Sequence, residues 1–391
     1  MSELNSSNLR KEQGNEGPDL VGLTELTSPY YMVPPSGTTD ERPQNPQKGT
    51  LRFNTDIGTL EYFRGDVIGW EQIQKTIPNL GASNAGTSNA GTGNRGLYMG
   101  GSTPTIINNI DYLTIPTFGN SQDFGDLTSA QASGGAVASS TRAVYGGGWT
   151  SPGVDICYVT IATTGNAIDF GADRTQGKGS YAYGSGNATR GLFWSAQDHP
   201  SYYNTIDYIT IATTGACAEF GDINMANGRY GGATFADSTR AINGGGVTGA
   251  TSTALNNIDY VTIATTGNGQ DFGDLTTAKR YVPGSSDTTR GVIYAGGAPA
   301  DSNIIEYVTI QSTGNSTDFG DATVARAHIA AMSNSIRGVF AGGVNPSIIN
   351  VMDSIIFQTT GNAVDWGDYA VENGVGSYSS GTSDSHGGLT E

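Results

Sequence analysis

The feature that most constrains this chain is a repeat of 47–50 residues that occurs six times within residues 95–391. Each copy opens with an arginine and a short apolar run that ends in a pair of small residues, as in RGLYMGG and TRAVYGGG. These arginines are Arg95, Arg142, Arg190, Arg240, Arg290 and Arg337. A fixed period of this length is typical of repeat proteins, in which each copy buries its apolar face against its neighbours.

The remainder of each copy is rich in strand signals. A six-residue run such as IDYVTI alternates β-branched and aromatic residues, and it is followed by a turn, mostly TTGN, and a compact DFGD-type motif. The motifs begin at Asp123, Asp169, Glu219, Asp271, Asp318 and Asp365. No helical period occurs in residues 95–385. Four strand-sized segments per copy predict an all-β, six-bladed β-propeller.

The order of the segments predicts how the ring closes. With the strands of a blade labelled a to d, the chain enters the repeat at strand b and leaves it after strand a. The first blade should therefore take strand a from residues 369–385, which removes free sheet edges. The last residues, His386 to Glu391, read as the truncated start of a further b strand.

The repeat resembles the Kelch repeat of β-propellers, with a double Gly after an apolar strand followed by acidic-aromatic and Phe/Trp strands. Its residue pattern, TRG…GG…IDYVTI-TTGNA-DFGDLT, more closely resembles repeats in virion structural proteins of marine bacteriophages, including cyanophages. The third copy departs from the pattern, with Ser195 and Ala196 in place of the glycine pair. The resemblance implies a Kelch-like propeller in a virion component such as a viral tail fibre protein.

The N-terminal part divides into three segments before the propeller of residues 95–391. Residues 1–48 read as an extended attachment arm, residues 49–79 as a small β segment and residues 80–94 as a Gly/Ser/Asn linker. The linker either lets the propeller swivel or runs as an ordered loop on a neighbour. The β segment resembles a motif of phage fibre and appendage proteins, and it is too small to be stable without self-association or docking.

The net charge and the cysteine content limit which partners the protein can bind and in which cellular compartment it folds. Residues 1–94 have a net charge of −4 and residues 95–391 a net charge of −13, which disfavours nucleic acid. The two cysteines are expected to be free thiols rather than a disulfide. The chain opens on a polar stretch without a leader and has no apolar run of membrane-spanning length, which predicts assembly in a host cytoplasm and no membrane insertion.

Residues for catalysis are sparse. The three histidines form no recognisable set with Ser, Cys or Asp, so no catalytic residue, metal site or cofactor is predicted. An arginine that occurs once per blade indicates a scaffold role, paired with a neighbouring Asp or with strand carbonyls, rather than an arginine cluster that holds a substrate carboxylate. The motif acids are expected to bind turn amides, with Ca²⁺ binding as the alternative.

Recognition is expected where the blades differ. The a–b and c–d connections are nearly uniform, whereas the b–c connections vary in length and composition. The candidate binding residues in or beside them are Trp149, Trp194, His199, Tyr202 and Tyr203. Exposed aromatic residues beside Asn and Ser suit sugar or protein surfaces. The alternative is neutral drift in tolerant surface loops.

These observations favour a non-enzymatic phage virion appendage of the tail, neck or head. Residues 1–79 would attach it to other virion proteins, and the propeller would recognise or decorate a host-surface glycan or protein. A purely structural virion connector is the first alternative. A glycan-cleaving propeller enzyme is the second, and the missing pair of catalytic carboxylates argues against it.

The size of the 49–79 β segment generates a testable prediction. The full chain is expected to be a homo-oligomer, most simply a homotrimer, because self-association supplies the surface that so small a segment cannot bury alone. A chain that begins near Gly81 should be monomeric. Light scattering on both proteins measures this, and a monomeric full-length protein would contradict it unless a second virion protein supplies the missing contacts.

Overall fold

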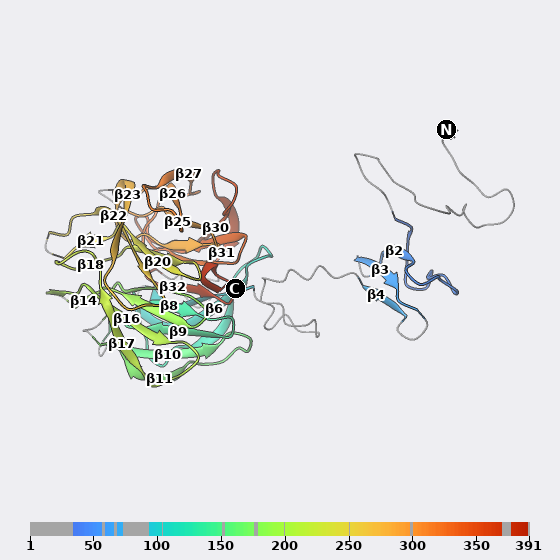
Figure 1. Cartoon of the computed structure of the whole chain (residues 1–391), viewed down its shortest axis with the longest axis horizontal. Helices are drawn as coiled ribbons and strands as arrows, with labels where there is room; N and C mark the ends of the chain where they lie inside the picture. The colour runs from blue at the N-terminus through green and yellow to red at the C-terminus, as the bar shows by residue number, and fades with distance from the viewer. Residues whose placement is uncertain are drawn as a thin grey trace. The chain divides into compact units, whose positions relative to one another are not determined.

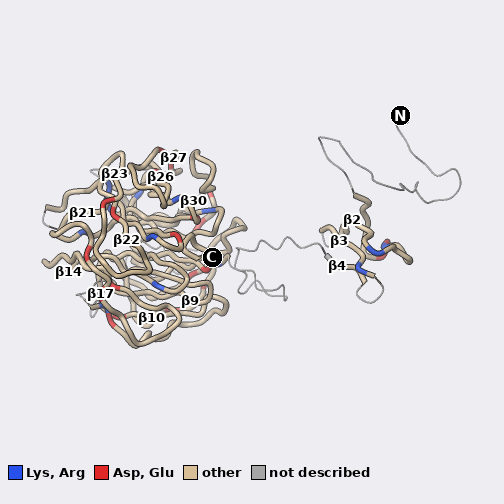
Figure 2. Tube along the Cα trace, viewed as in Figure 1, with Lys and Arg blue, Asp and Glu red and all other residues tan. Residues whose placement is uncertain are grey.

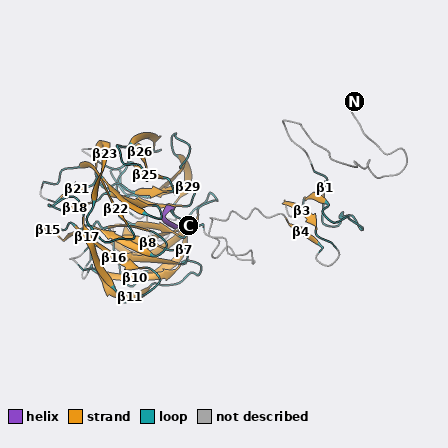
Figure 3. Ribbon diagram, viewed as in Figure 1, coloured by secondary structure: helices purple, strands orange, loops and turns teal. Residues whose placement is uncertain are grey.

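The computed structural model describes residues 34–56, 59–65, 69–72, 94–103, 105–150, 153–175, 179–198, 200–249, 251–297, 300–369 and 377–389. The chain divides into two compact units, Met1–Thr76 and Ile77–Glu391, which are treated separately (Figure 1). Strands make up the structure, and the one helical element among the described residues is the short 3₁₀ turn η2 (Gly387–Leu389; Figure 3). No helix in the described ranges has the length and apolar character needed to cross a membrane.

The repeats fold into six four-stranded antiparallel sheets, numbered here in chain order. Sheet 1 contains β32 (Ser380–Ser383), β5 (Arg95–Thr103), β6 (Thr105–Thr114) and β7 (Gln122–Asp126). Sheet 2 contains β8 (Gly135–Ala138), β9 (Arg142–Gly146), β10 (Asp155–Thr160) and β11 (Ile168–Asp173). Sheet 3 contains β12 (Tyr183–Gly186), β13 (Arg190–Trp194), β16 (Thr205–Thr210) and β17 (Cys217–Asp222).

The other three sheets repeat this order. Sheet 4 contains β19 (Ala233–Ala236), β20 (Arg240–Gly244), β22 (Leu255–Thr262) and β23 (Gln270–Lys279). Sheet 5 contains β24 (Gly284–Ser286), β25 (Arg290–Tyr294), β26 (Ile304–Thr309) and β27 (Thr317–Asp321). Sheet 6 contains β28 (Ala330–Ser333), β29 (Arg337–Ala341), β30 (Val351–Ile356) and β31 (Val364–Asp368). Two short pairs, β14 (Gln197–Asp198) with β15 (Ser201–Tyr202) and β18 (Arg229–Tyr230) with β21 (Val247–Thr248), lie in the connections.

Sheet 1 is assembled from both ends of the repeat array. The C-terminal strand β32 pairs with β5, with Ser380 opposite Met99, which is the pairing that the order of segments predicts. The turn that joins strands a and b elsewhere is also rebuilt here, because the Asp384 carboxylate accepts the amide of Arg95 at 2.9 Å. In sheet 4, Asp237 accepts the amide of Arg240 in the same way within one continuous turn. The two chain segments therefore replace a covalent turn with hydrogen bonds.

Apolar side chains fill the spaces between the sheets. Six clusters of buried residues each combine side chains from two sheets; five lie between consecutive sheets and the sixth lies between sheets 6 and 1. The aromatic residue of each DFGD-type motif, such as Phe124 or Trp366, is buried in one of these clusters. Burial of this kind contributes about 1.5–3 kcal/mol per large side chain and holds the sheets face to face.

The repeat arginines bind across these same interfaces. Each guanidinium donates to the main-chain carbonyl at the end of strand c of the next sheet, as Arg142 does to Ile211 at 2.8 Å. The last arginine, Arg337, donates to Ile115 of sheet 1 at 3.5 Å. Each also lies over an aromatic ring of its own sheet, for example Arg142 over Tyr158 at 4.2 Å. Carbonyls, not aspartates, are therefore the partners of this scaffold residue.

The glycine of the DFGD motif is explained by the next sheet. Gly125 has a φ of 145°, and a Cβ there would lie 2.6 Å from the carbonyl carbon of Gly165 in the c–d turn of sheet 2. The same turn binds the preceding outer strand, since the amide of Gly165 donates to Phe124 and the side chain of Asn166 accepts the amide of Asp126. The TTGN turn is thus hydrogen-bonded to the outer strand of the preceding sheet and is not a free loop.

The motif acids behave differently from the expectation. The first acids (Asp123, Asp169, Glu219, Asp271, Asp318 and Asp365) are exposed on the outermost strands. Among the described residues, the expected turn-amide bond is recorded for Asp169 to Gly171, at 2.8 Å, in the copy that carries an insertion. In sheets 1 and 3 to 6 the amide of the second acid binds an Asn of the next turn instead, as Asp274 does to Asn315.

Four buried acids of strand c pair with cations that lie at the end of the preceding strand d or after it. Arg174 pairs with Asp207 at 3.1 Å and Arg229 with Asp259 at 2.7 Å. Lys279 with Glu306 and Arg326 with Asp353 complete the set at 3.1 and 2.8 Å. Both partners are almost fully buried in each pair, so removal of one would leave an uncompensated charge.

The C-terminal residues correct one expectation. Residues His386 to Leu389 do not begin a further b strand; they form η2 and pack among the inner strands. His386 Nε2 lies 2.9 Å from the Ala138 carbonyl of sheet 2, and a Cβ at Gly388 would overlap the Gly186 carbonyl of sheet 3. The turn can adopt this position because two consecutive glycines have no side chain to accommodate.

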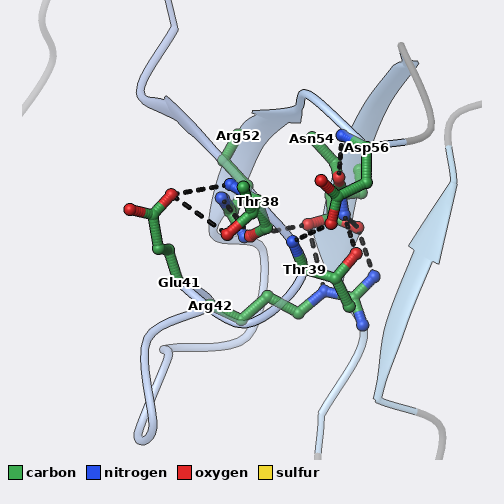
Figure 4. Close-up of polar contacts among 8 residues, drawn as sticks. Thr38, Thr39, Glu41, Arg42, Arg52, Asn54 and Asp56 are labelled. Atoms are coloured by element: carbon green, nitrogen blue, oxygen red, sulfur yellow. Dashed lines mark hydrogen bonds and ion pairs between the residues drawn. The ribbon is translucent and has the colours of Figure 1, made fainter.

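The smaller unit is a four-stranded sheet built around a buried carboxylate. Its strands are β1 (Ser36–Gly37), β2 (Leu51–Asn54), β3 (Thr59–Phe63) and β4 (Trp70–Gln72), so residues assigned to the extended arm contribute its first strand. Glu61 binds Arg42 at 2.6 Å and Arg52 at 3.2 Å. Figure 4 shows the surrounding contacts, including those of Thr38 with Glu41. Hydrogen bonds from Arg42 keep the pKa of Glu61 low, so the network is charged at neutral pH.

The rebuilt turn in sheet 1 generates a prediction. Burial raises the pKa of Asp384 to about 6 from an ordinary value of 3.8, so the folded protein holds a proton that the unfolded chain releases between about pH 4 and 6. Ionised Asp384 therefore lowers stability as the pH rises through 6. Asp384→Asn should keep the acceptor, as Asn187 and Asn334 do in their own turns, and remove this cost. The free energy of unfolding should increase by roughly 1–3 kcal/mol at pH 8 and change little at pH 4.

Urea denaturation of both proteins at the two pH values measures this difference. A variant that loses stability equally at pH 4 and pH 8 would show that the carboxylate is needed for a reason other than its role as acceptor.

Candidate functional site

One position in every d–a connection has a left-handed backbone. It lies two or three residues before strand a of each sheet, and its φ is between 54° and 69° in all six. The residues are Ser133, Tyr181, Gly231, Tyr281, His328 and Tyr378. Five of them are not glycine, and for those the left-handed region costs about 1 kcal/mol each. A strained conformation that recurs at equivalent positions indicates that surrounding contacts impose it.

Those contacts are main-chain hydrogen bonds between sheets. The amide of Ser133 donates to the Tyr378 carbonyl at 2.7 Å, that of Tyr378 to His328 at 3.3 Å, and that of His328 to Tyr281 at 3.1 Å. Gly231 likewise donates to Tyr181 at 3.4 Å. The left-handed residues are thus bonded to one another, and this arrangement groups their side chains. We call these six positions the turn ring.

The turn ring carries most of a cluster of aromatic side chains. His328 lies between Tyr281 and Tyr378, with ring centroids 4.1 and 4.0 Å away. Tyr181 lies 5.5 Å from Tyr281 and 6.1 Å from Tyr378. The centroids fall within the range of favourable aromatic contacts. Three further rings join them, and the aromatic cluster comprises Trp149, Tyr181, Tyr202, Tyr230, Tyr281, His328 and Tyr378.

Two members come from the variable b–c connections. Trp149, from sheet 2, contacts Tyr181 at 6.0 Å and Tyr378 at 6.3 Å, and half of its surface is exposed. Tyr202, from sheet 3, stacks on Tyr230 at 5.9 Å with an interplanar angle of 18°. The b–c and d–a connections leave an antiparallel sheet at the same end, which is why segments so distant in sequence supply one cluster.

The space between the inner strands is narrow. A cavity of about 50 Å³ is lined by residues from strand a of all six sheets, among them Val137, Ser185 and Met332, and by His386. A second cavity of about 30 Å³ is lined by Tyr183, Ile329 and Ser379 among others. Such volumes hold one or a few water molecules rather than a sugar or a cofactor. A ligand of that size would therefore not fit between the inner strands.

The turn-ring side chains of the cluster are uncharged at neutral pH. Burial lowers the pKa of His328 to about 3, with a smaller contribution from the nearby Arg280 guanidinium. Burial also raises the pKa of Tyr281 to about 12 and raises that of Tyr378. The rings therefore present neutral faces and hydroxyl groups, which suits stacking against an apolar surface combined with hydrogen bonding.

The candidate binding residues separate into three groups. Trp149 and Tyr202 belong to the aromatic cluster. Trp194 is wrong as a surface residue: it is fully buried in the cluster between sheets 3 and 4, and its indole donates to Ser185 at 2.8 Å. Tyr203 is half-buried and its amide donates to the Ala196 carbonyl at 2.9 Å, while His199 lies outside the described residues.

The turn-ring aromatics are not among the binding residues predicted from the sequence, because they lie outside the b–c connections that differ most between copies. A signal was present in the sequence, since Tyr or His stands just before strand a in SYAY, RYVP, AHIA and SYSS. These residues recur with the repeat period, and this favours a structural interpretation. The left-handed backbone brings these aromatic side chains together, and this proximity could not be predicted from the sequence.

Other chemistry is limited in the described part of the chain. No group of three or more His, Cys, Asp or Glu side chains there could hold a metal ion. Cys157 and Cys217 are free thiols, as expected. Figure 2 shows acidic and basic positions scattered over the larger unit rather than gathered at one place.

No family model matches the chain, and no curated protein matches its sequence.

The turn ring generates a prediction about stability. Ser133→Gly should raise the free energy of unfolding by roughly 0.5–1 kcal/mol, because glycine has no left-handed penalty and the buried Ser133 hydroxyl has no hydrogen-bond partner among the described residues. Gly231→Ala is the reverse change, since its Cβ would lie 2.9 Å from the Tyr281 ring, and it should lower stability by about 1 kcal/mol or more.

Thermal and urea unfolding of both variants measure these changes. Equal stabilities for all three proteins would mean that the left-handed turns carry no strain.

Proposed function

We propose that this protein is a non-enzymatic phage virion appendage whose six sheets form a closed Kelch-like β-propeller, and that the aromatic cluster binds a carbohydrate of the host surface. The smaller N-terminal unit would attach the propeller to other virion proteins. The observation that carries the proposal is a partly exposed aromatic cluster at the end of the sheets where the variable connections emerge.

Closure is supported by contacts between the last sheet and the first. Arg337 of sheet 6 donates to Ile115 of sheet 1, and the amide of Asp368 donates to Asn120. The Ser383 hydroxyl of sheet 1 donates to the Ser333 carbonyl of sheet 6. Each bond has a counterpart between consecutive sheets, for instance Ser333 to Ser286. The interface between sheets 6 and 1 therefore uses the same chemistry as the others, as a circular array requires.

Carbohydrate is favoured by the form of the cluster. Neighbouring ring centroids are 4.0–6.3 Å apart, so the rings fill the space between themselves and leave no cage for a cation. A surface of aromatic faces edged by phenol hydroxyls suits a pyranose, which has an apolar C–H face and a polar rim. Trp149 is 51% exposed, and among the exposed large apolar side chains of the described residues it is the one that belongs to the aromatic cluster, which is consistent with a binding role.

The virion assignment depends on the resemblance of the repeat to marine-phage structural proteins. It is supported by the division of the chain into a small β unit and a large repeat unit, which suits attachment at one end and recognition at the other. A structural connector would use the same scaffold but would not require the aromatic cluster to bind anything.

Truncation of the exposed ring tests the proposal. A panel of bacterial surface oligosaccharides would be screened with the full chain, and the affinity for the best ligand would be compared between wild type and Trp149→Ala. Aromatic anchors contribute about 2 kcal/mol, so affinity should fall some thirtyfold. Tyr202→Ala should have a smaller effect, because Tyr202 is half-buried on Tyr230.

The controls lie at the other end of the sheets. Thr163→Ala changes an exposed residue of a uniform c–d turn, and Phe118→Ala removes an exposed aromatic ring there. All variants must melt like wild type. If Trp149→Ala binds as tightly as the controls, the aromatic cluster is not the recognition surface and the connector function becomes the better proposal.

A further inference from the structure

One basic residue beside the aromatic cluster differs from the other described cations that lie at the end of strand d or after it. The buried cations Arg174, Arg229, Lys279 and Arg326 each pair with a carboxylate at 2.7–3.1 Å. Arg280 directly follows Lys279 in the chain, yet no carboxylate of the described residues lies within 4 Å of its guanidinium. It is half-buried, and its partner is the face of Tyr281, 5.5 Å from the ring centroid.

Its position in the repeat is also unusual. The residue just before each turn-ring position is Ala132, Ser180, Tyr230, Arg280, Ala327 or Ser377. Five of these are neutral, and the charged one stands beside Tyr281 and His328, whose ring centroids are 4.1 Å apart. No scaffold bond requires the charge, because the contacts that fix Arg280 are main-chain bonds to Gly297, at 2.9 Å in both directions. Main-chain hydrogen bonds therefore fix the position of Arg280, while its guanidinium has no carboxylate partner among the described residues.

Nearby groups define what such a cation could bind. Asp301 lies on the b–c connection of sheet 5, close enough for Arg280 to influence its titration but beyond ion-pair distance. A guanidinium held over an aromatic ring keeps its planar fork of donors free for a planar, bidentate acceptor. The adjoining neutral rings provide the stacking surface. These features together suit a single anionic group attached to a stacked sugar.

We infer that the aromatic cluster and Arg280 form one site that selects a carboxylated sugar, a uronic acid, over its neutral counterpart. The sugar ring lies on the aromatic faces, and its carboxylate receives hydrogen bonds from Arg280. A carboxylate attached directly to the pyranose ring stays close to the ring plane, and a guanidinium beside the stacking surface meets it there. This inference depends on the proposed carbohydrate-binding function and names the ligand class.

The overall acidity of the protein does not oppose this choice. The motif acids that supply much of the negative charge lie exposed on the fourth strand of each sheet, whereas the turn ring precedes the first strand. Interactions between exposed charges separated by more than about 8–10 Å are largely screened at physiological ionic strength. A local guanidinium therefore outweighs the distant carboxylates for a ligand with one charge.

Two matched disaccharides test the inference: one that ends in glucuronic acid, and the same disaccharide ending in glucose. Titrations of the full chain, followed by NMR or calorimetry, should show roughly tenfold tighter binding of the acidic sugar, because a charge-assisted hydrogen bond is lost with the neutral one. Arg280→Gln should bind both equally. Arg280→Lys keeps the charge and should retain part of the preference for the acidic sugar. Asp301→Asn should not reduce that preference.

The variants separate the two levels of the proposal. Trp149→Ala should weaken both disaccharides while leaving their ratio unchanged. If wild type binds the two sugars equally, or if Arg280→Gln keeps the preference, the role of Arg280 is overturned while the carbohydrate site stands. If wild type binds neither sugar, the inference fails. If it also binds no other oligosaccharide of the panel, the proposed function fails with it.

Discussion

The structure depends on hydrogen bonds that cross from each sheet to the next. One four-stranded sheet of a repeat protein cannot cover its own apolar faces, which are buried only against the neighbouring sheets. The repeat arginine links two sheets, because it donates to a carbonyl of the next sheet while its guanidinium lies over a tyrosine of its own sheet. The arginine therefore satisfies a carbonyl at the end of a strand, where no ladder partner is available, and fixes the spacing between two sheets at once.

The other repeated residues make sense in the same terms. The glycine of DFGD lets a turn of the next sheet approach, and the Asn of TTGN binds the amide behind it. Where the third copy has Ala216 in place of that Asn, the preceding motif carries the inserted residue, and Asp169 binds its own turn amide instead. Motifs that look like strand and turn signals within one copy are thus mostly contacts between copies. This is why they recur so faithfully while the b–c connections do not.

The candidate site arises from the same inter-sheet bonding. Main-chain bonds between turn-ring residues impose a left-handed backbone, and that backbone gathers tyrosine and histidine side chains from four d–a connections. The main-chain bonds that join the sheets therefore also create the aromatic surface that we propose as a binding site. Variation in the b–c connections then adds Trp149 and Tyr202 to a base that the repeat supplies. Under the proposed function, recognition on this surface would change by loop substitution without disturbing the scaffold, as in other folds whose variable loops are held by a rigid frame.

The sequence alone determined the all-β class, the six repeats, the strand positions and the pairing of the C-terminal strand with the first repeat. These follow from local patterns and from the order of segments along the chain. It also singled out Trp149 and Tyr202, which the structure places in the aromatic cluster. It placed Trp194 on the surface, because an aromatic residue at the end of a strand looks the same in sequence whether it faces solvent or a neighbouring sheet. The partners of the arginines, the packing of η2 among the inner strands and the aromatic cluster were decided only by tertiary structure. Each of them joins residues from different sheets, and no local pattern encodes which side chains meet when sheets pack face to face.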